Sequence, residues 1–158
     1  MSSDTHIKFD GVDGESTHEK HKGEIDVLSW TWGVSNAARV AGGGSGVGKA
    51  LPGEFHFTHS YDKASPNLAK YCASGKHFAT VAMTARKAGG AQEDFLKISM
   101  KEVFVTSVQP GGTSTGDVVE NVSMTYREVE FDYKPQDDKG ALGGSVKFGW
   151  NVDTTKIT

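Results

Sequence analysis

Cysteine is nearly absent from this sequence, in which Cys72 is the single one among 158 residues. An internal disulfide needs two cysteines, and the common cysteine-based zinc sites need at least as many, so both are excluded. The apolar runs are far shorter than the ~20 residues of a membrane-spanning helix, and we expect no membrane insertion. Lys and Arg do not cluster and the formal net charge is −3, which argues against a nucleic-acid partner.

The N-terminus also lacks the features of a secretory leader. It begins MSSDTH, with neither a basic start nor an apolar core, so no signal peptide is predicted. We therefore expect the chain to be synthesised in the cytoplasm, and any export to depend on machinery that needs no such signal.

Proline is scarce, with 4 residues, whereas glycine is abundant, with 20. The glycines fall between apolar stretches, which is typical of turns in a folded protein. Hydrophobic residues make up 36% and charged residues 23%, a composition that predicts a packed core. At this length we expect one domain, residues 1–158, with a protruding glycine-rich loop.

Alternation of apolar and polar residues predicts β-strands along most of the chain. Residues 25–34 have an apolar face and a small polar face: Leu28, Trp30, Trp32 and Val34 on the first, Ser29, Thr31 and Gly33 on the second. Further strands are expected at 54–59, 78–86, 95–109, 118–133 and 146–152. The apolar phase changes inside two of them, with a β-bulge expected near Glu102, which favours a sheet that closes on itself.

One helix is predicted, after Asp62. Ser65 is the expected N-cap, Pro66 suits the first turn, and Gly75 is placed to end the helix in the left-handed conformation. Leu68, Tyr71 and Cys72 form one apolar stripe. The fold class is therefore all-β, mainly antiparallel, as a barrel or sandwich with one short flanking helix.

Residues 36–53 do not fit this pattern, because they are rich in glycine and offer little to anchor them in a core. Structureless loops longer than ~12–15 residues are uncommon in compact domains and are usually functional. We predict an arm that projects from the barrel and packs on another molecule or moves freely.

The motifs that could carry chemistry are weak. Gly43–Lys49 matches the start of a phosphate-binding loop, but Ala50 replaces the required Ser or Thr and Pro52 leaves no room for the following helix. His18 and His21 lie in a charged stretch that we interpret as a solvated loop without a metal. We predict no catalytic residue, no metal and no cofactor, and hence a protein that is not an enzyme.

Two alternatives were weighed against a structural role. A hydrolytic β-barrel would need a nucleophile beside a base, and the sequence offers no such pair. A monomeric ligand-binding β-sandwich could use Trp30, Trp32 and Trp150 to stack on sugars, although the first two share the apolar face of 25–34. The small polar face of that segment instead favours a surface that avoids adhesion, and so a structural or assembly role.

An ordered set of motifs resembles the haemolysin-coregulated protein family, the tube subunit of the bacterial type VI secretion system. The resemblance covers about residues 5–155 and rests on motifs in a fixed order: Gly14–Ser16, Ile25–Ser35, Gly42–Lys49, Asp62–Leu68, Gly75–His77, Arg86–Gly90, Val108–Gly112, Tyr133–Gln136 and Gly144–Trp150.

The resemblance implies a closed barrel of two sheets with one flanking helix, like phage tail-tube proteins. It implies a homohexameric ring that stacks into a tube, driven from the cell by a contractile sheath, tipped by a valine-glycine-repeat spike protein and able to carry small secreted effectors. Ser29 and Thr31 are then expected to line the lumen. The arm is expected to contact the next subunit or ring through Arg39, Val40, Gly42, Gly43, Gly44, Gly46, Val47, Gly48, Lys49 and Leu51.

Overall fold

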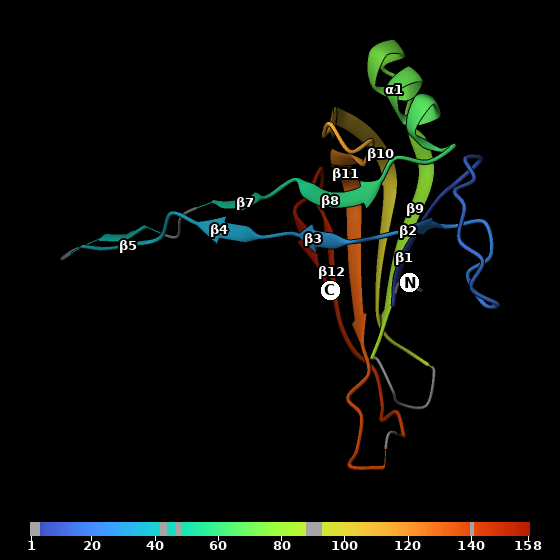
Figure 1. Ribbon diagram of the computed structural model, residues 1–158. Coiled ribbons are helices and arrows are strands. Elements are labelled where there is room, and N and C mark those ends of the chain that lie inside the picture. The colour runs from blue at the N-terminus through green and yellow to red at the C-terminus, as the bar shows by residue number, and fades with distance from the viewer. Residues whose placement is uncertain (1–3, 42–43, 47–48, 88–92, 140) are drawn as a thin grey trace.

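The computed structural model describes residues 4–41, 44–46, 49–87, 93–139 and 141–158. These residues form one short helix and a series of antiparallel strands (Figure 1). In chain order the elements are β1 (Thr5–Phe9), β2 (Ile25–Asp26), β3 (Ser29–Thr31), β4 (Val34–Asn36), β5 (Arg39–Ala41), β6 (Gly44–Gly46), β7 (Ala50–Pro52), β8 (Phe55–Ser60), α1 (Ser65–Ser74), β9 (Phe78–Arg86), β10 (Asp94–Gly112), β11 (Val118–Tyr133), β12 (Val146–Asn151) and β13 (Lys156–Ile157).

The main sheet has nine strands, with β11 at its branch point. One path runs β13-β12-β11-β10-β9-β1-β2, and the first half of β11 also pairs with β8, which pairs with β3. The β2 end of this path and the branch formed by β8 and β3 meet in the segment between β2 and β3. Val27 N donates to Thr5 O of β1 at 2.9 Å, and Leu28 N donates to Thr58 O of β8 at 2.8 Å. Two consecutive residues thus join opposite sides of the sheet, and the predicted barrel-like, mainly antiparallel fold is confirmed.

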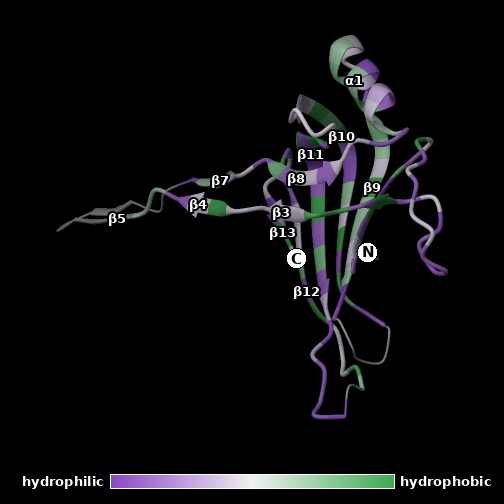
Figure 2. Cartoon of the chain, in the orientation of Figure 1, coloured by the Kyte–Doolittle hydropathy of each residue, from purple (hydrophilic) through white to green (hydrophobic). Residues whose placement is uncertain are grey.

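The core lies inside this ring of strands and is dominated by aromatic residues. Phe9, Phe55, Phe57 and Phe78 are almost fully buried, and each contributes about 1.5–3 kcal/mol by leaving water. Apolar and polar residues alternate along β10 and β11, as the colouring of these strands makes visible (Figure 2). Only one face of each long strand therefore packs into the core.

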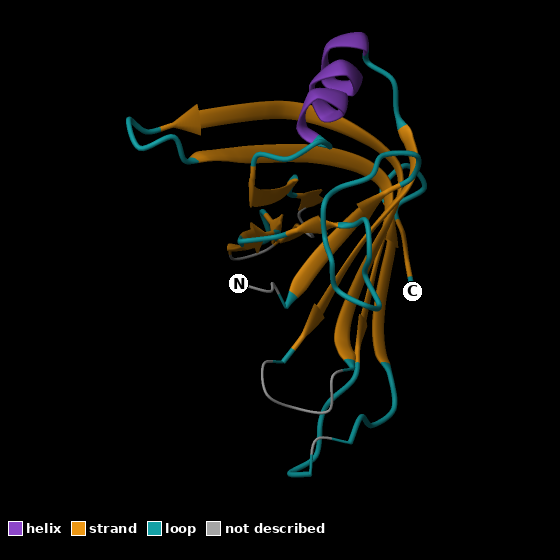
Figure 3. Ribbon diagram, turned by 45° about the vertical axis from the view of Figure 1, so that its right-hand side comes forward, coloured by secondary structure: helices purple, strands orange, loops and turns teal. Residues whose placement is uncertain are grey.

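The change of phase predicted inside β10 is confirmed, but the bulge lies elsewhere. Met100 and Val103 are both buried, so the inward face changes between them, and Glu102 has a left-handed φ of 49°. The register with β11 is unchanged there and shifts instead between Val105 and Ser107. The long strands curve strongly past α1 (Figure 3), which is the bending that such irregularities allow.

Helix α1 packs on β10 and ends as predicted, with Gly75 in the left-handed conformation at φ 71°. Its start differs from the prediction. The N-cap is Ala64, and Ser65 is already helical and nearly fully buried. Its Oγ accepts the Asp62 amide at 3.1 Å, while Asp62 Oδ1 accepts the Ala64 amide at 2.9 Å. The Asp62 side chain thus accepts a backbone amide hydrogen bond at the start of the helix, a role that the sequence predicted for Ser65.

The strand predicted at 25–34 is divided into β2, β3 and the start of β4. Trp30 and Trp32 pack against the core, but Leu28 is 60% and Val34 51% exposed. The prediction of one apolar face was therefore wrong at both ends. The reason is that Leu28 lies where the chain changes partner strand, and Val34 lies where it leaves the barrel.

The arm predicted at 36–53 is not structureless. β4 pairs with β7, and β5 pairs with β6, so the arm is an antiparallel ribbon that extends away from the barrel (Figure 1). Backbone hydrogen bonds across the ribbon replace the core contacts that a glycine-rich sequence cannot make.

Candidate functional site

The two predicted lumen residues lie on β3 and point away from the core. Ser29 and Thr31 are both exposed, whereas Trp30 between them stacks on Phe55 with ring centroids 5.9 Å apart. The alternation that the sequence indicated therefore holds over these three residues. Their place in a lumen remains a prediction, because it depends on neighbouring subunits.

The polar face continues from β3 across β8 onto β11. Thr58 lies opposite Ser29, and its Oγ1 donates to Asn121 Oδ1 at 2.6 Å. In the next row, His56 lies opposite Thr31 and its Nδ1 is 2.7 Å from the Ser123 Oγ. The sequence analysis did not assign these residues to the site, although polar residues alternate with buried aromatics in β8.

This face carries almost no formal charge. Its outward residues on β3, β8 and the first half of β11 are Ser29, Thr31, His56, Thr58, Ser60, Val119, Asn121, Ser123 and Thr125. His56 is the only one of them with an ionisable side chain. Small neutral hydroxyls and amides bind neighbours weakly and without dependence on salt. We name this set the neutral face.

The second half of β11 and the part of β10 that faces it present the opposite chemistry. Lys101 Nζ is 3.7 Å from Glu128 Oε2, and Arg127 contacts Glu102 at 2.9 Å and Asp153 at 2.7 Å. These side chains are largely exposed, so each pair contributes about 0–1 kcal/mol. Strand β11 therefore runs from a neutral region into a charged one.

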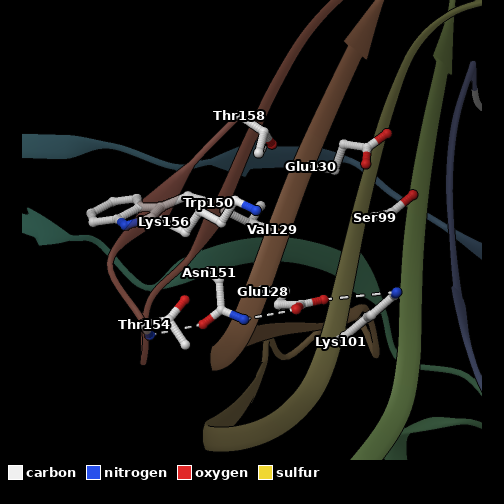
Figure 4. Close-up of a pocket in the computed structure, with 11 residues that line it drawn as sticks. Ser99, Lys101, Glu128, Val129, Glu130, Trp150, Asn151, Thr154, Lys156 and Thr158 are labelled. Carbon is white, nitrogen blue, oxygen red and sulfur yellow. Dashed lines mark hydrogen bonds and ion pairs between the residues drawn. The ribbon is translucent and has the colours of Figure 1, made fainter.

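A cavity of about 250 Å³ opens on the charged half, beside the C-terminal segment (Figure 4). The Glu128 carboxylate accepts the Asn151 Nδ2 at 2.8 Å and approaches Lys101, and the Asn151 side chain in turn accepts the Thr154 amide at 3.0 Å. These polar groups already bond to one another. The cavity shows no nucleophile beside a base among the residues that line it.

The three tryptophans are committed to packing, which weakens the sugar-binding alternative. Trp150 is 6% exposed, Trp30 stacks on Phe55, and the Trp32 Nε1 donates to the Tyr126 hydroxyl. All three indole rings are thus engaged in contacts within the chain.

The base of the arm is held by close backbone contact. Gly53 N donates to Gly33 O at 2.8 Å, and the Tyr126 hydroxyl donates to Gly53 O at 2.7 Å. A Cβ added at Gly53 would lie 2.5 Å from Gly33 O, so only glycine fits. The barrel wall and the arm are thus coupled through Tyr126.

The predicted contact residues of the arm divide into three groups. Arg39, Val40, Gly44 and Gly46 lie in the paired β5 and β6. Lys49 is exposed and Leu51, in β7, is 55% exposed. Gly42, Gly43, Val47 and Gly48 lie outside the described residues. The contacts themselves remain a prediction.

Three histidines are buried, and one of them, His21, contradicts our interpretation of 18–21 as a solvated stretch, in which only Glu19 and Lys20 are exposed. His21 is 6% exposed and packs on His6, which is 1% exposed. His59 is fully buried and lies 2.9 Å from Glu120. Contacts with strands that are distant in the sequence bury these side chains. Within the described residues, no group of His, Cys, Asp or Glu is arranged to hold a metal ion.

No helix in the described part of the chain is both long and apolar enough to span a membrane.

Comparison with known proteins gives consistent matches over nearly the whole chain. Residues 6–133 match a protein family described as "Type VI secretion system effector, Hcp". Protein hcp1 of Pseudomonas aeruginosa PAO1 is 46% identical over 156 residues, which cover 96% of each chain. A solved structure of a type six secretion system protein has a TM-score of 0.93 at 35% identity, covering 99% of this chain and 100% of its own. Hcp1 from Salmonella typhimurium has a TM-score of 0.82 at 35% identity, with 100% of both chains covered.

Proposed function

The chain belongs to the Hcp family of type VI secretion proteins, and we propose that six copies form a ring and that rings stack into the secretion tube. The observation that carries this proposal is the match over the complete fold, because the barrel, the helix and the projecting arm are all covered by the aligned structures. The role is structural, and no chemical step is assigned to any residue.

The neutral face supplies the lumen wall in this proposal. A channel that passes folded cargo must offer hydrogen bonds without holding the cargo by strong charges, and the hydroxyls and amides around Ser29 and Thr31 suit that need. Small effectors would bind there reversibly and be protected until delivery.

The arm supplies contacts between copies. It extends from the barrel as a ribbon and exposes Val34 and Leu51, each more than half accessible. Apolar side chains on a narrow ribbon gain little from the ribbon itself, and their burial against a neighbouring subunit or ring would stabilise the assembly. The remaining partners are the sheath around the tube and the valine-glycine-repeat spike at its end, with release outside the cell.

The first test is the absolute mass of the purified protein by light scattering, combined with electron microscopy. A particle of six times 16.9 kDa with a central hole supports the proposal. A monomer at high protein concentration would remove the basis for a channel, and the ligand-binding alternative would then need testing.

A further inference from the structure

The loop between β1 and β2 folds back so that two of its histidines meet a third on β1. The His21 ring stacks on His6 with centroids 4.8 Å apart and an interplanar angle of 11°, and His18 lies 5.2 Å from His6. Three imidazoles in contact are a titratable group that the tube function does not use. We name His6, His18 and His21 the histidine cluster.

The cluster attaches the loop to the rest of the barrel. His21 Nε2 is 3.1 Å from Asp94 Oδ1 of β10, and His18 Nε2 is 2.7 Å from Arg86 Nη1 of β9. By contrast, the backbone hydrogen bonds of residues 14–24 join the loop to itself, as in Gly14 N to Gly23 O at 2.7 Å. A further contact, from the Lys63 amide to Glu15 Oε2, holds the loop near α1.

The bond between Arg86 and His18 exists only while His18 is neutral. A guanidinium has donors and no acceptor, so His18 Nε2 must offer its lone pair. A proton on that nitrogen would set one N–H against another at 2.7 Å and place two positive charges together. This contact is therefore sensitive to acid because of its geometry.

We propose that the histidine cluster is an acid-opened latch, which holds residues 13–24 on β1, β9 and β10 at neutral pH and releases them at acidic pH. The latch belongs to the barrel of the single chain.

The surroundings of His6 also make the cluster less stable in acid. Burial lowers its pKa from 6.5, and the charges of His21 and His18 lower it further, whereas Asp26 and Glu24 raise it. The unfolded chain therefore binds this proton more readily than the native one. Stability from His6 is complete above pH 6.5 and is lost as the pH falls through the lowered native pKa.

The charges around the cluster do not compensate a fully protonated state. Asp26 faces His6 at 3.1 Å, Glu24 faces His21 at 2.9 Å, and Asp94 is shared between His21 and Arg86. Three carboxylates then meet three imidazolium ions and one guanidinium. The adjoining cavity of about 390 Å³ adds one further carboxylate, Asp132, and more positive charge than it balances, from Lys8, Lys20, Lys97 and Lys134.

Release of this loop would also loosen β2 and β3, the segment that closes the barrel. β2 follows directly and is paired with β1 at only His6–Asp26 and Ile7–Ile25, and β3 with Ser29 and Thr31 comes next. This last consequence rests on the proposed function, since it would loosen the lumen wall of a tube in an acidic compartment.

Hydrogen–deuterium exchange of the full chain near pH 7.5 and near pH 5, corrected for intrinsic rates, tests the latch. We expect protection of residues 14–24 to fall about tenfold or more at the lower pH, while β10 and β11 change little. His18→Gln offers Arg86 an amide oxygen that cannot be protonated, and His6→Gln removes the buried imidazole. At least one variant should keep the loop protected near pH 5, whereas His77→Gln, outside the cluster, should open like the parent.

Unchanged protection in the parent would overturn the latch, and so would equal acid opening in the parent and both cluster variants. Light scattering on the same samples separates this result from the proposed function. A monomer whose loop opens in acid would support the latch and contradict the proposed tube function. A hexamer whose loop is unchanged in acid would support the tube function and contradict the latch.

Discussion

Glu120 accepts a hydrogen bond from His59 Nε2 at 2.9 Å, and water reaches neither side chain to a significant extent. The two residues face each other across the pairing of β8 and β11. Asp62 Oδ2 lies 3.7 Å from the other ring nitrogen of His59, just before α1 begins. These buried contacts of His59 thus connect the wall of the neutral face to the start of the helix.

This pair predicts stability that decreases at alkaline pH. Burial would lower the pKa of His59, but the Asp62 and Glu120 carboxylates outweigh burial and raise it above 6.5. Stability from His59 is therefore complete below pH 6.5 and is lost as the pH rises through the raised native value. Glu120→Gln should lower the free energy of unfolding by about 3 kcal/mol near pH 6 and by less near pH 9, as measured by urea unfolding.

The exposed Glu130 on the same strand is the matched control. Its carboxylate is 4.0 Å from Lys147 Nζ, and Glu130→Gln should change stability by less than about 1 kcal/mol at either pH. A deficit in Glu120→Gln that is the same at both pH values would contradict the protonated His59.

The long strands and the helix were predictable because each buries one side. In β9, Val81 and Met83 are buried and repeat every second residue, and in α1 the stop at Gly75 follows from the φ that glycine favours. Signals of this kind depend only on residues close together in the sequence, so they predict the local structure correctly. β1 was missed because its five residues contain only Ile7 and Phe9 as an alternating pair.

What could not be predicted depends on contacts between distant residues. His21 and Asp94 are 73 positions apart, so nothing near residue 21 in the sequence indicates that it is buried. The arm is a second case, because its ribbon is made by backbone hydrogen bonds, which leave no apolar pattern in a glycine-rich segment. Of the candidate site, only the part on β3 could be found, since the rest depends on register with β8 and β11.

The close approach at the base of the arm gives a matched pair of substitutions. Gly53→Ala would place a Cβ 2.5 Å from Gly33 O and should cost about 1–3 kcal/mol, because backbone must move. Gly33→Ala meets nothing within 4 Å and should stay within about 0.5 kcal/mol of the parent. Thermal unfolding of both proteins measures the difference, and similar values for the two would show that the base tolerates a shift.

Deletion of residues 41–48 should leave the barrel folded, because β4 and β7 and the contacts at Gly53 remain. Stacking of rings and secretion should both weaken, since the outer arm would be lost. The measurements are the circular dichroism spectrum, the length of assemblies by electron microscopy, and the amount of protein secreted. Normal secretion by a folded deletion variant would refute the role of the arm.

Salt should control assembly of the pure protein. Each chain carries a formal charge of −3, so a hexamer would carry six times that charge and rings would repel one another at low ionic strength. We expect isolated rings in dilute buffer, with stacking only at high salt or with other tube components present. Long tubes that form spontaneously at low salt, seen by electron microscopy, would contradict this expectation.

The neutral face predicts an effect of side-chain length at Thr31. Thr31→Gln keeps the site uncharged but adds a longer side chain on an exposed position of β3, which should obstruct cargo without disturbing the core. A clash of about 1.4 kcal/mol would lower cargo occupancy about tenfold. Ring mass by light scattering should equal that of the parent, while co-secretion of effectors falls.

Thr154→Gln, at an exposed threonine near the C-terminus, is the control and should secrete effectors normally. If Thr31→Gln secreted effectors as well as Thr154→Gln does, the longer side chain would have no effect on cargo. Thr31 would then not belong to the surface that contacts cargo.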